Sequence, residues 1–119
     1  MVDKFKKLPA RFYKKASGTE PVREWLQEFS KQDKVSIGEA IQMVEFGWPI
    51  GMPVCRSLRG YNPLWEVRAN ISNGIARVIF YVKNNEMILL HGFVKKTQKT
   101  PIKDLDLAMQ RKKEHDKNN

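Results

Sequence analysis

Hydrophobic positions along this chain follow a helical spacing in the first half and a strand spacing in the second. Two apolar stripes with i, i+3, i+4, i+7 spacing precede residue 48, one formed by Val22, Trp25, Leu26 and Phe29 and the other by Ile37, Ala40, Ile41 and Val44. Each stripe predicts an amphipathic helix that buries one side. A helix start is favoured by Thr19-Glu20-Pro21, and a helix end by Gly47 followed by Pro49.

After Gly60 the apolar residues recur at every second position. Residues 65, 67, 69 and 71 are apolar and alternate with polar residues, which predicts a half-buried strand. Asn73-Gly74 and Asn84-Asn85 are turn signals, so two more strands are expected over residues 75–82 and 87–94. A short strand over residues 11–15 and a last helix opening at Thr100-Pro101 complete the pattern. We therefore predict a single α+β domain over residues 1–119, of order β-α-α-β-β-β-α, with an antiparallel sheet packed against helices and a frayed tail at 112–119.

The charge of the chain narrows its function more than its composition does. Among 119 residues, 22 are Lys or Arg and 13 are Asp or Glu, giving a net charge of +9. The positive charge avoids residues 16–55, which hold three bases and six acids, and gathers on the predicted strands and the two ends. This distribution is typical of proteins that bind a phosphate backbone.

Several other classes of protein are disfavoured by the same sequence. No apolar run reaches the ~20 residues of a membrane span, so we expect a cytoplasmic protein with no membrane partner. One cysteine allows no internal disulfide, and with two histidines it cannot form a typical zinc site. There is no glycine-rich phosphate loop and no serine in a Gly-flanked elbow. We therefore expect no metal and no cofactor.

The two predicted turns allow a register argument for the sheet. If Asn73-Gly74 is a two-residue turn, Arg68 lies opposite Ile79 and Asn70 lies opposite Arg77. The second turn then places Gly92 opposite Arg77, leaving open space above the arginine. His91 falls on the opposite side with Val78, although a slip of one residue would reverse that assignment.

This register gathers charged and aromatic side chains on one face of the sheet, namely Glu66, Arg68, Arg77, Tyr81 and, at its edge, Lys96. Two neighbouring arginines repel each other, and an anionic ligand such as phosphate would relieve that repulsion. The alternative is that each arginine pairs with Glu66 or with an acid from a helix. We favour the phosphate interpretation.

Two strings of residues resemble a known family. L-W-E-V-R (residues 64–68) and H-G-F-x-K-K-T-x-K-T-P (residues 91–101), in this order and with Leu58-Arg59-Gly60 before them, are similar to the phage-derived killer branch of the RelE/ParE superfamily, whose members are often identified as HigB-type toxins. The resemblance covers nearly the whole domain. It implies a small RelE-like fold.

The resemblance also implies an activity. RelE-like toxins of type II toxin–antitoxin systems enter the ribosomal A site and cut messenger RNA without a metal, through attack of the 2′-hydroxyl on the adjacent phosphate. Carried onto this chain, the catalytic residues are Arg68, Arg77 and Lys96. Substrate-binding residues are expected at Arg59, Tyr61, Tyr81, Lys95 and Lys99, although Tyr81 fits a core position equally well. Glu66 is a candidate base whose other role is to pair with the arginines, and the general base stays open.

The partners that the resemblance implies are the ribosome, messenger RNA and a HigA-like helix-turn-helix antitoxin. Two other functions remain open from the sequence. One is a ParE-like toxin of the same fold that poisons DNA gyrase, and the other is a non-enzymatic RNA-binding module, for which the positive charge would suffice. The two arginines and the lysines of residues 95–99 favour RNA cleavage.

Overall fold

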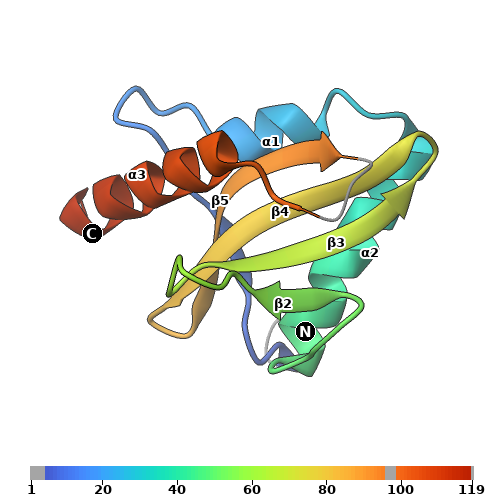
Figure 1. The fold of residues 1–119 in the computed structure, drawn as a ribbon, viewed down its shortest axis with the longest axis horizontal. Coiled ribbons are helices and arrows are strands. Elements are labelled where there is room, and N and C mark those ends of the chain that lie inside the picture. The colour runs from blue at the N-terminus through green and yellow to red at the C-terminus, as the bar shows by residue number, and fades with distance from the viewer. Residues whose placement is uncertain (1–4, 96–98, 119) are drawn as a thin grey trace.

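The computed structural model describes residues 5–95 and 99–118, which form a five-stranded sheet with helices on both faces (Figure 1). The sheet has the order β1-β5-β4-β3-β2, with strands β1 (Ala10–Phe12), β2 (Cys55–Ser57), β3 (Trp65–Ile71), β4 (Gly74–Lys83) and β5 (Glu86–Lys95). The helices are α1 (Pro21–Leu26), α2 (Lys31–Gly47) and α3 (Ile102–Asn118). The predicted α+β class with a sheet packed against helices is confirmed.

The sheet is mixed, whereas the sequence pattern predicted an antiparallel one. Strands β2 to β5 form an antiparallel meander, and β1 pairs in parallel with β5 at one edge. Strand β2 was not predicted at all. Both edge strands are only three residues long, so neither can show the alternation by which longer strands are recognised.

Two apolar cores form, one on each face of the sheet. The predicted stripes of α1 and α2 pack on one face, against β3, β4 and β5, with Val22, Ile37 and Val44 fully buried. The second face carries a smaller core that includes Leu105 and Ala108 of α3. Helix α3 packs on β5 and β4, so it leaves the β2–β3 side of this face uncovered by helix (Figure 1).

The first hairpin turn lies one residue earlier than predicted. Ile71 pairs with Gly74 across a Ser72-Asn73 turn, and Arg68 therefore lies directly opposite Arg77 rather than diagonal to it. The cause is a tertiary contact, because the Asp33 carboxylate on α2 accepts hydrogen bonds from the Ser72 amide (3.1 Å) and hydroxyl (2.7 Å). The predicted second turn is confirmed, since Lys83 pairs with Glu86 and both asparagines between them have positive φ.

A β-bulge in β5 overturns the predicted positions of His91 and Gly92. Phe80 pairs with Leu89 but Ile79 pairs with His91, so Leu90 is the extra residue. Beyond the bulge every side chain changes face, which moves His91 to the α3 side and places Gly92 opposite Val78. The space above Arg77 is therefore not left open by Gly92.

Helix α3 supports this bulge and continues to Asn118, so the prediction of a frayed tail at 112–119 is wrong for residues 112–118. The Arg111 guanidinium donates to the Leu90 carbonyl at 2.9 Å. In the last turns, Asp116 accepts hydrogen bonds from the Tyr81 hydroxyl and from Lys83 at 2.8 Å. A polar sequence can thus form a docked helix when its polar groups find partners on the sheet. No helix in the described part of the chain is long and apolar enough to cross a membrane.

Candidate nucleic-acid interface

A basic groove opens on the part of the sheet that α3 does not cover. It has a volume of about 730 Å³ and lies between the end of β2 with its following loop and the start of α3. We call it the Arg56 groove; its lining is Arg56, Ser57, Leu58, Arg59, Tyr61, Lys99, Thr100, Ile102 and Leu105. Three of these side chains are cations and none is acidic, so the groove is complementary to an anion.

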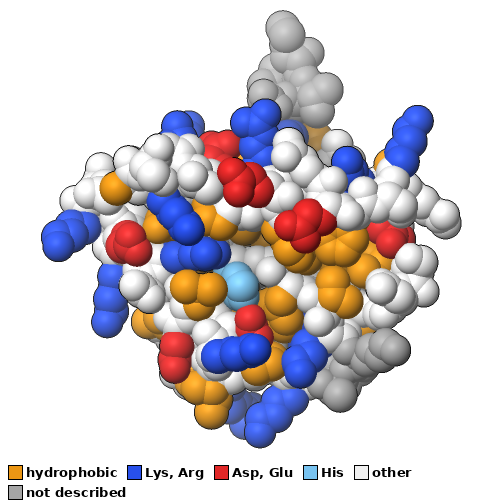
Figure 2. All heavy atoms as spheres, turned by 90° about the horizontal axis from the view of Figure 1, so that it is seen from above, with side chains coloured by type: hydrophobic (Ala, Val, Ile, Leu, Met, Phe, Trp, Pro, Cys, Tyr) orange, Lys and Arg blue, Asp and Glu red, His pale blue; other side chains and the backbone are white. Residues whose placement is uncertain are grey.

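Charge alone would not have located this groove. Figure 2 shows one face of the molecule on which Lys and Arg side chains stand both near the centre and around the rim, with acidic side chains and apolar surface between them. The positive charge is therefore spread over the surface, as expected for a net charge of +9. The groove is distinguished by its shape and by what lies beneath it.

Beneath the groove, one buried carboxylate holds several arginines. Glu66 is completely buried, and its Oε2 lies 3.2 Å from Nε of Arg56 and 3.9 Å from Nε of Arg68. Its Oε1 lies 3.8 Å from Nη1 of Arg77 and accepts a 2.7 Å hydrogen bond from the Thr100 hydroxyl. Three guanidinium groups around one carboxylate leave an excess of two positive charges. We call this set, with Thr100, the Glu66 cluster.

Arg77 lies at the bottom of the Glu66 cluster, out of reach of a substrate. Its side chain is 0% exposed, and it donates to the Thr100 hydroxyl at 3.4 Å. Burial lowers the pKa of Arg77, while the Glu66 carboxylate opposes that shift. Because its side chain is completely buried, Arg77 does not reach the groove as the expected catalytic residue, and its position beside Glu66 corrects that assignment.

Arg68 is also mostly buried, with 9% of its side chain exposed. It lines a second, smaller cavity of about 280 Å³ together with Pro53, Val54, Asn70 and Ile75. By contrast, 33% of the Arg56 side chain is exposed, and its Nε is held by Glu66. The guanidinium that combines exposure with fixed orientation is therefore that of Arg56.

The structure brings together three of the predicted substrate-binding residues, Arg59, Tyr61 and Lys99, in the Arg56 groove. Lys95 is exposed at the end of β5 and lies outside the groove lining. Lys96 lies outside the described residues.

Tyr81 takes the core position that the sequence left open as its alternative. It is 3% exposed. Burial is the main cause that raises the pKa of Tyr81 well above the ordinary value, and its hydrogen bond to Asp116 acts in the same direction. The expected role of Tyr81 in binding substrate is therefore not supported. A role of Glu66 as the general base is not supported either, because both its oxygens are occupied and it has no exposed surface. Its pairing with the arginines is confirmed.

Arg56 is the groove residue that the sequence analysis missed. It lies in a strand of three residues, so no alternation marked it as sharing a face with Glu66. Its backbone partner in the sheet is Glu66 itself, and this pairing brings the two side chains together. The available signal was that Arg56 belongs to residues 56–83, a segment with five basic residues and one acidic residue.

A second polar pair on this face lies apart from the groove. His91 Nε2 is 2.6 Å from Asp104 Oδ1, and the imidazole stacks on the Phe93 ring. Burial lowers the pKa of His91 below its ordinary value, although the hydrogen bond and the charge of Asp104 act in the opposite direction. Among residues 5–95 and 99–118, no three His, Cys, Asp or Glu side chains lie close enough together to hold a metal ion.

Comparison with known proteins places the chain in a family. A search of curated proteins finds no match. Residues 24–113, which include β2 to β5 and most of α3, match the model of the family described as phage-derived protein Gp49-like (DUF891). The matched residues contain the Arg56 groove and the whole Glu66 cluster. The chain therefore belongs to the phage-derived Gp49-like family, a RelE-like family of toxin–antitoxin systems.

Proposed function

We propose that this protein is the toxin of a type II toxin–antitoxin system and that it cleaves messenger RNA in the ribosomal A site. The observation that carries the proposal is the Arg56 groove, in which three cations and the phenol of Tyr61 surround an open space above the Glu66 cluster. Family membership supports a toxin, and the groove supports RNA as its target. The protein would act in the cytoplasm, where translating ribosomes are found.

The groove suits a reaction in which negative charge develops on phosphorus. The 2′-hydroxyl gives its proton to water, and its oxygen bonds to the adjacent phosphorus to form a cyclic phosphate. The bond from phosphorus to the 5′-oxygen of the next nucleotide breaks, and that oxygen takes up a proton. The transition state is more negative than the substrate, so fixed cations accelerate the step. Arg56 is held in place by Glu66 and needs little reorganisation when the substrate binds.

The remaining groove residues have roles that follow from their chemistry. Arg59 binds a non-bridging phosphate oxygen beside Arg56. Lys99 is an ammonium that can donate a proton to the leaving 5′-oxygen. Tyr61 offers a flat ring on which a base can stack. Buried Arg68 and Arg77 act from below, by holding Glu66 in place and keeping the groove positively charged.

The toxin would be held inactive by a HigA-like helix-turn-helix antitoxin. A protein that cleaves messenger RNA needs such control. Because the toxin has a net charge of +9, an acidic segment of the partner would be attracted to its surface. No cofactor takes part in the proposed reaction. The metal-independent chemistry is likewise part of the proposal.

Reconstituted translation of a defined message tests this function. We expect primer extension to find cuts only when ribosomes are present, and we expect the new 3′ ends to carry a cyclic phosphate. Cuts on naked RNA at equal rate would remove the ribosome from the proposal. An uncut message would overturn the proposal, and inhibition of supercoiling by purified gyrase in a parallel assay would then identify a gyrase poison.

A further inference from the structure

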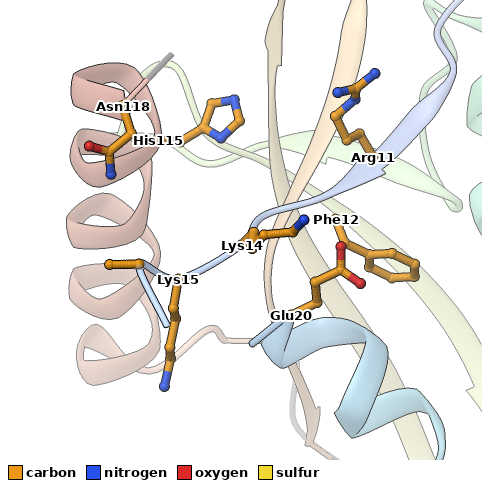
Figure 3. A pocket seen from close by; sticks show the side chains of 8 residues that line it. Arg11, Phe12, Lys14, Lys15, Glu20, His115 and Asn118 are labelled. Atoms are coloured by element: carbon orange, nitrogen blue, oxygen red, sulfur yellow. The ribbon is translucent and has the colours of Figure 1, made fainter. Parts of the chain in front are cut away.

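A second basic cavity lies at the opposite edge of the sheet from the Arg56 groove. It has a volume of about 330 Å³ and opens between β1, the loop after it and the last turns of α3 (Figure 3). Its lining is Arg11, Phe12, Lys14, Lys15, Ala16, Glu20, His115 and Asn118, and we call it the β1 cleft. Because β1 and β2 are the two edge strands, α3 separates the β1 cleft from the groove.

The cations of the β1 cleft are available to a ligand. Lys14 and Lys15 are exposed, and neither forms an ion pair within the described part of the chain. Arg11 is 64% exposed and lies 3.1 Å from the Glu86 carboxylate, which leaves most of its guanidinium open to solvent. Three cations therefore line the cleft against one carboxylate, that of Glu20.

The rest of the lining is suited to a nucleotide rather than to a simple anion. His115 contributes a flat ring and Asn118 contributes an amide, whereas the Phe12 ring packs against the core on the α1–α2 face of the sheet. Figure 3 shows the imidazole of His115 directed from α3 toward β1, while Phe12 and Glu20 lie on the other side of the β1 backbone in this view. Burial, together with the charges of Lys83 and Arg11, lowers the pKa of His115, which favours the neutral form of the ring.

An acidic peptide would fit this lining less well than RNA does. The Glu20 carboxylate and the side-chain oxygen of Asn118 accept hydrogen bonds, and a peptide carboxylate has no proton to donate to them. The same groups accept hydrogen bonds from the amino group of a base or from a ribose hydroxyl. A cleft of about 330 Å³ is also within the ~300–1,000 Å³ range of small-molecule sites.

We propose that the β1 cleft is a second RNA subsite, which binds one nucleotide through Lys14 and Lys15 at its phosphate and His115 at its base. The site does not depend on the proposed cleavage reaction, since its residues are separate from the groove. If the proposed function holds, the β1 cleft contacts RNA away from the cut.

Binding of a ten-nucleotide single-stranded RNA, followed by fluorescence anisotropy, tests this site. The variant Lys14→Glu/Lys15→Glu should bind about tenfold more weakly than wild type, and the salt dependence should become shallower by roughly 0.7 for the loss of one neutralised phosphate. The matched control is Lys31→Glu/Lys34→Glu, which changes the net charge equally on exposed positions of α2. Equal weakening by both variants would overturn the proposal, because it would mean that only overall charge matters.

A second measurement identifies the ligand class. Adenosine monophosphate should shift the imidazole NMR signals of His115 in wild type and equally in an Arg56→Ala/Arg59→Ala variant, which separates this site from the groove. An equal shift with inorganic phosphate would reduce the cleft to a simple anion site. Tighter binding of a ten-residue glutamate peptide than of the RNA would overturn the nucleotide assignment in favour of a protein partner.

Discussion

Glu66 holds three arginines of this protein at different depths below the surface. Its carboxylate is buried between the three arginines of the Glu66 cluster, of which Arg77 and Arg68 are held below the surface and Arg56 reaches the groove. A buried carboxylate is costly unless it is paired and hydrogen-bonded. The three guanidinium groups and the Thr100 hydroxyl meet that requirement.

Replacement of Arg77 is therefore a test of stability before it is a test of activity. Arg77→Ala removes the largest fully buried side chain and one cation beside Glu66, so we expect it to lower the free energy of unfolding by about 3–5 kcal/mol. Arg56→Ala removes a one-third-exposed partner of the same carboxylate and should cost only about 1 kcal/mol. Urea denaturation measures both. Equal costs would mean that Glu66 does not depend on its buried partner.

The two histidines make stability depend on pH. Burial lowers the folded-state pKa of both His91 and His115, so the unfolded chain takes up their protons at a higher pH than the folded protein does. The free energy of unfolding should therefore fall as the pH drops below the unfolded value of about 6.5.

The variant His91→Gln isolates the contribution of His91, because the glutamine amide can still donate to Asp104. Its loss of stability between about pH 7 and pH 5 should be smaller than that of wild type. Urea denaturation at a series of pH values is the measurement, and His115→Gln is the matched variant. If wild type instead became more stable on acidification and His91→Gln did not, Asp104 would dominate His91 and the stated direction would be wrong.

At the scale of elements, the sequence predicted the long helix α2 and the three long strands well, and their relative positions less well. Periodicity reports which side of an element is buried, but it does not report tertiary contacts. The Ser72 turn was displaced by the Asp33 carboxylate, and the bulge at Leu90 depends on Arg111 of α3. Both contacts join residues more than 20 positions apart, so no local pattern contains them.

The sequence predicted only part of the candidate site, because local patterns do not contain the tertiary contacts that build it. Arg59, Tyr61 and Lys99 were found through the resemblance, which carries information about where loops meet. Arg56 was missed because its strand is too short to show a pattern. The depth of Arg68 and Arg77 could not be read from alternation, since alternation assigns a side chain to a face without saying what covers that face.

Two glycine substitutions test the bulge in β5 and the conformation of helix α2. A Cβ at Gly92 would lie 2.4 Å from the Trp25 ring, so Gly92→Ala should destabilise the protein by about 1–3 kcal/mol. A Cβ at Gly38, in the middle of α2, meets nothing within 4 Å, so Gly38→Ala should stabilise it by roughly 0.5–1 kcal/mol. Thermal unfolding of both variants is the measurement. A neutral Gly92→Ala would contradict the packing of β5 on Trp25 that follows from the bulge.

At the scale of the whole molecule, the fold separates two basic regions with one helix. Helix α3 packs on β5 and β4, the Arg56 groove lies on its β2 side, and the β1 cleft lies beside its last turns. The helix therefore supports both regions without filling either. An RNA partner larger than a single strand could contact both the Arg56 groove and the β1 cleft at once.

The central claim is that the Arg56 groove cleaves RNA on ribosomes, and a pair of variants tests it most directly. In reconstituted translation, Arg56→Ala/Arg59→Ala should cleave the message about 100-fold more slowly than wild type, which is the usual cost of removing groups that stabilise a charged transition state. Arg23→Ala, an exposed arginine on α1, should cleave at the wild-type rate. Circular dichroism checks that each variant is folded. Full activity in the folded groove variant would contradict the account, as would equal losses in both variants.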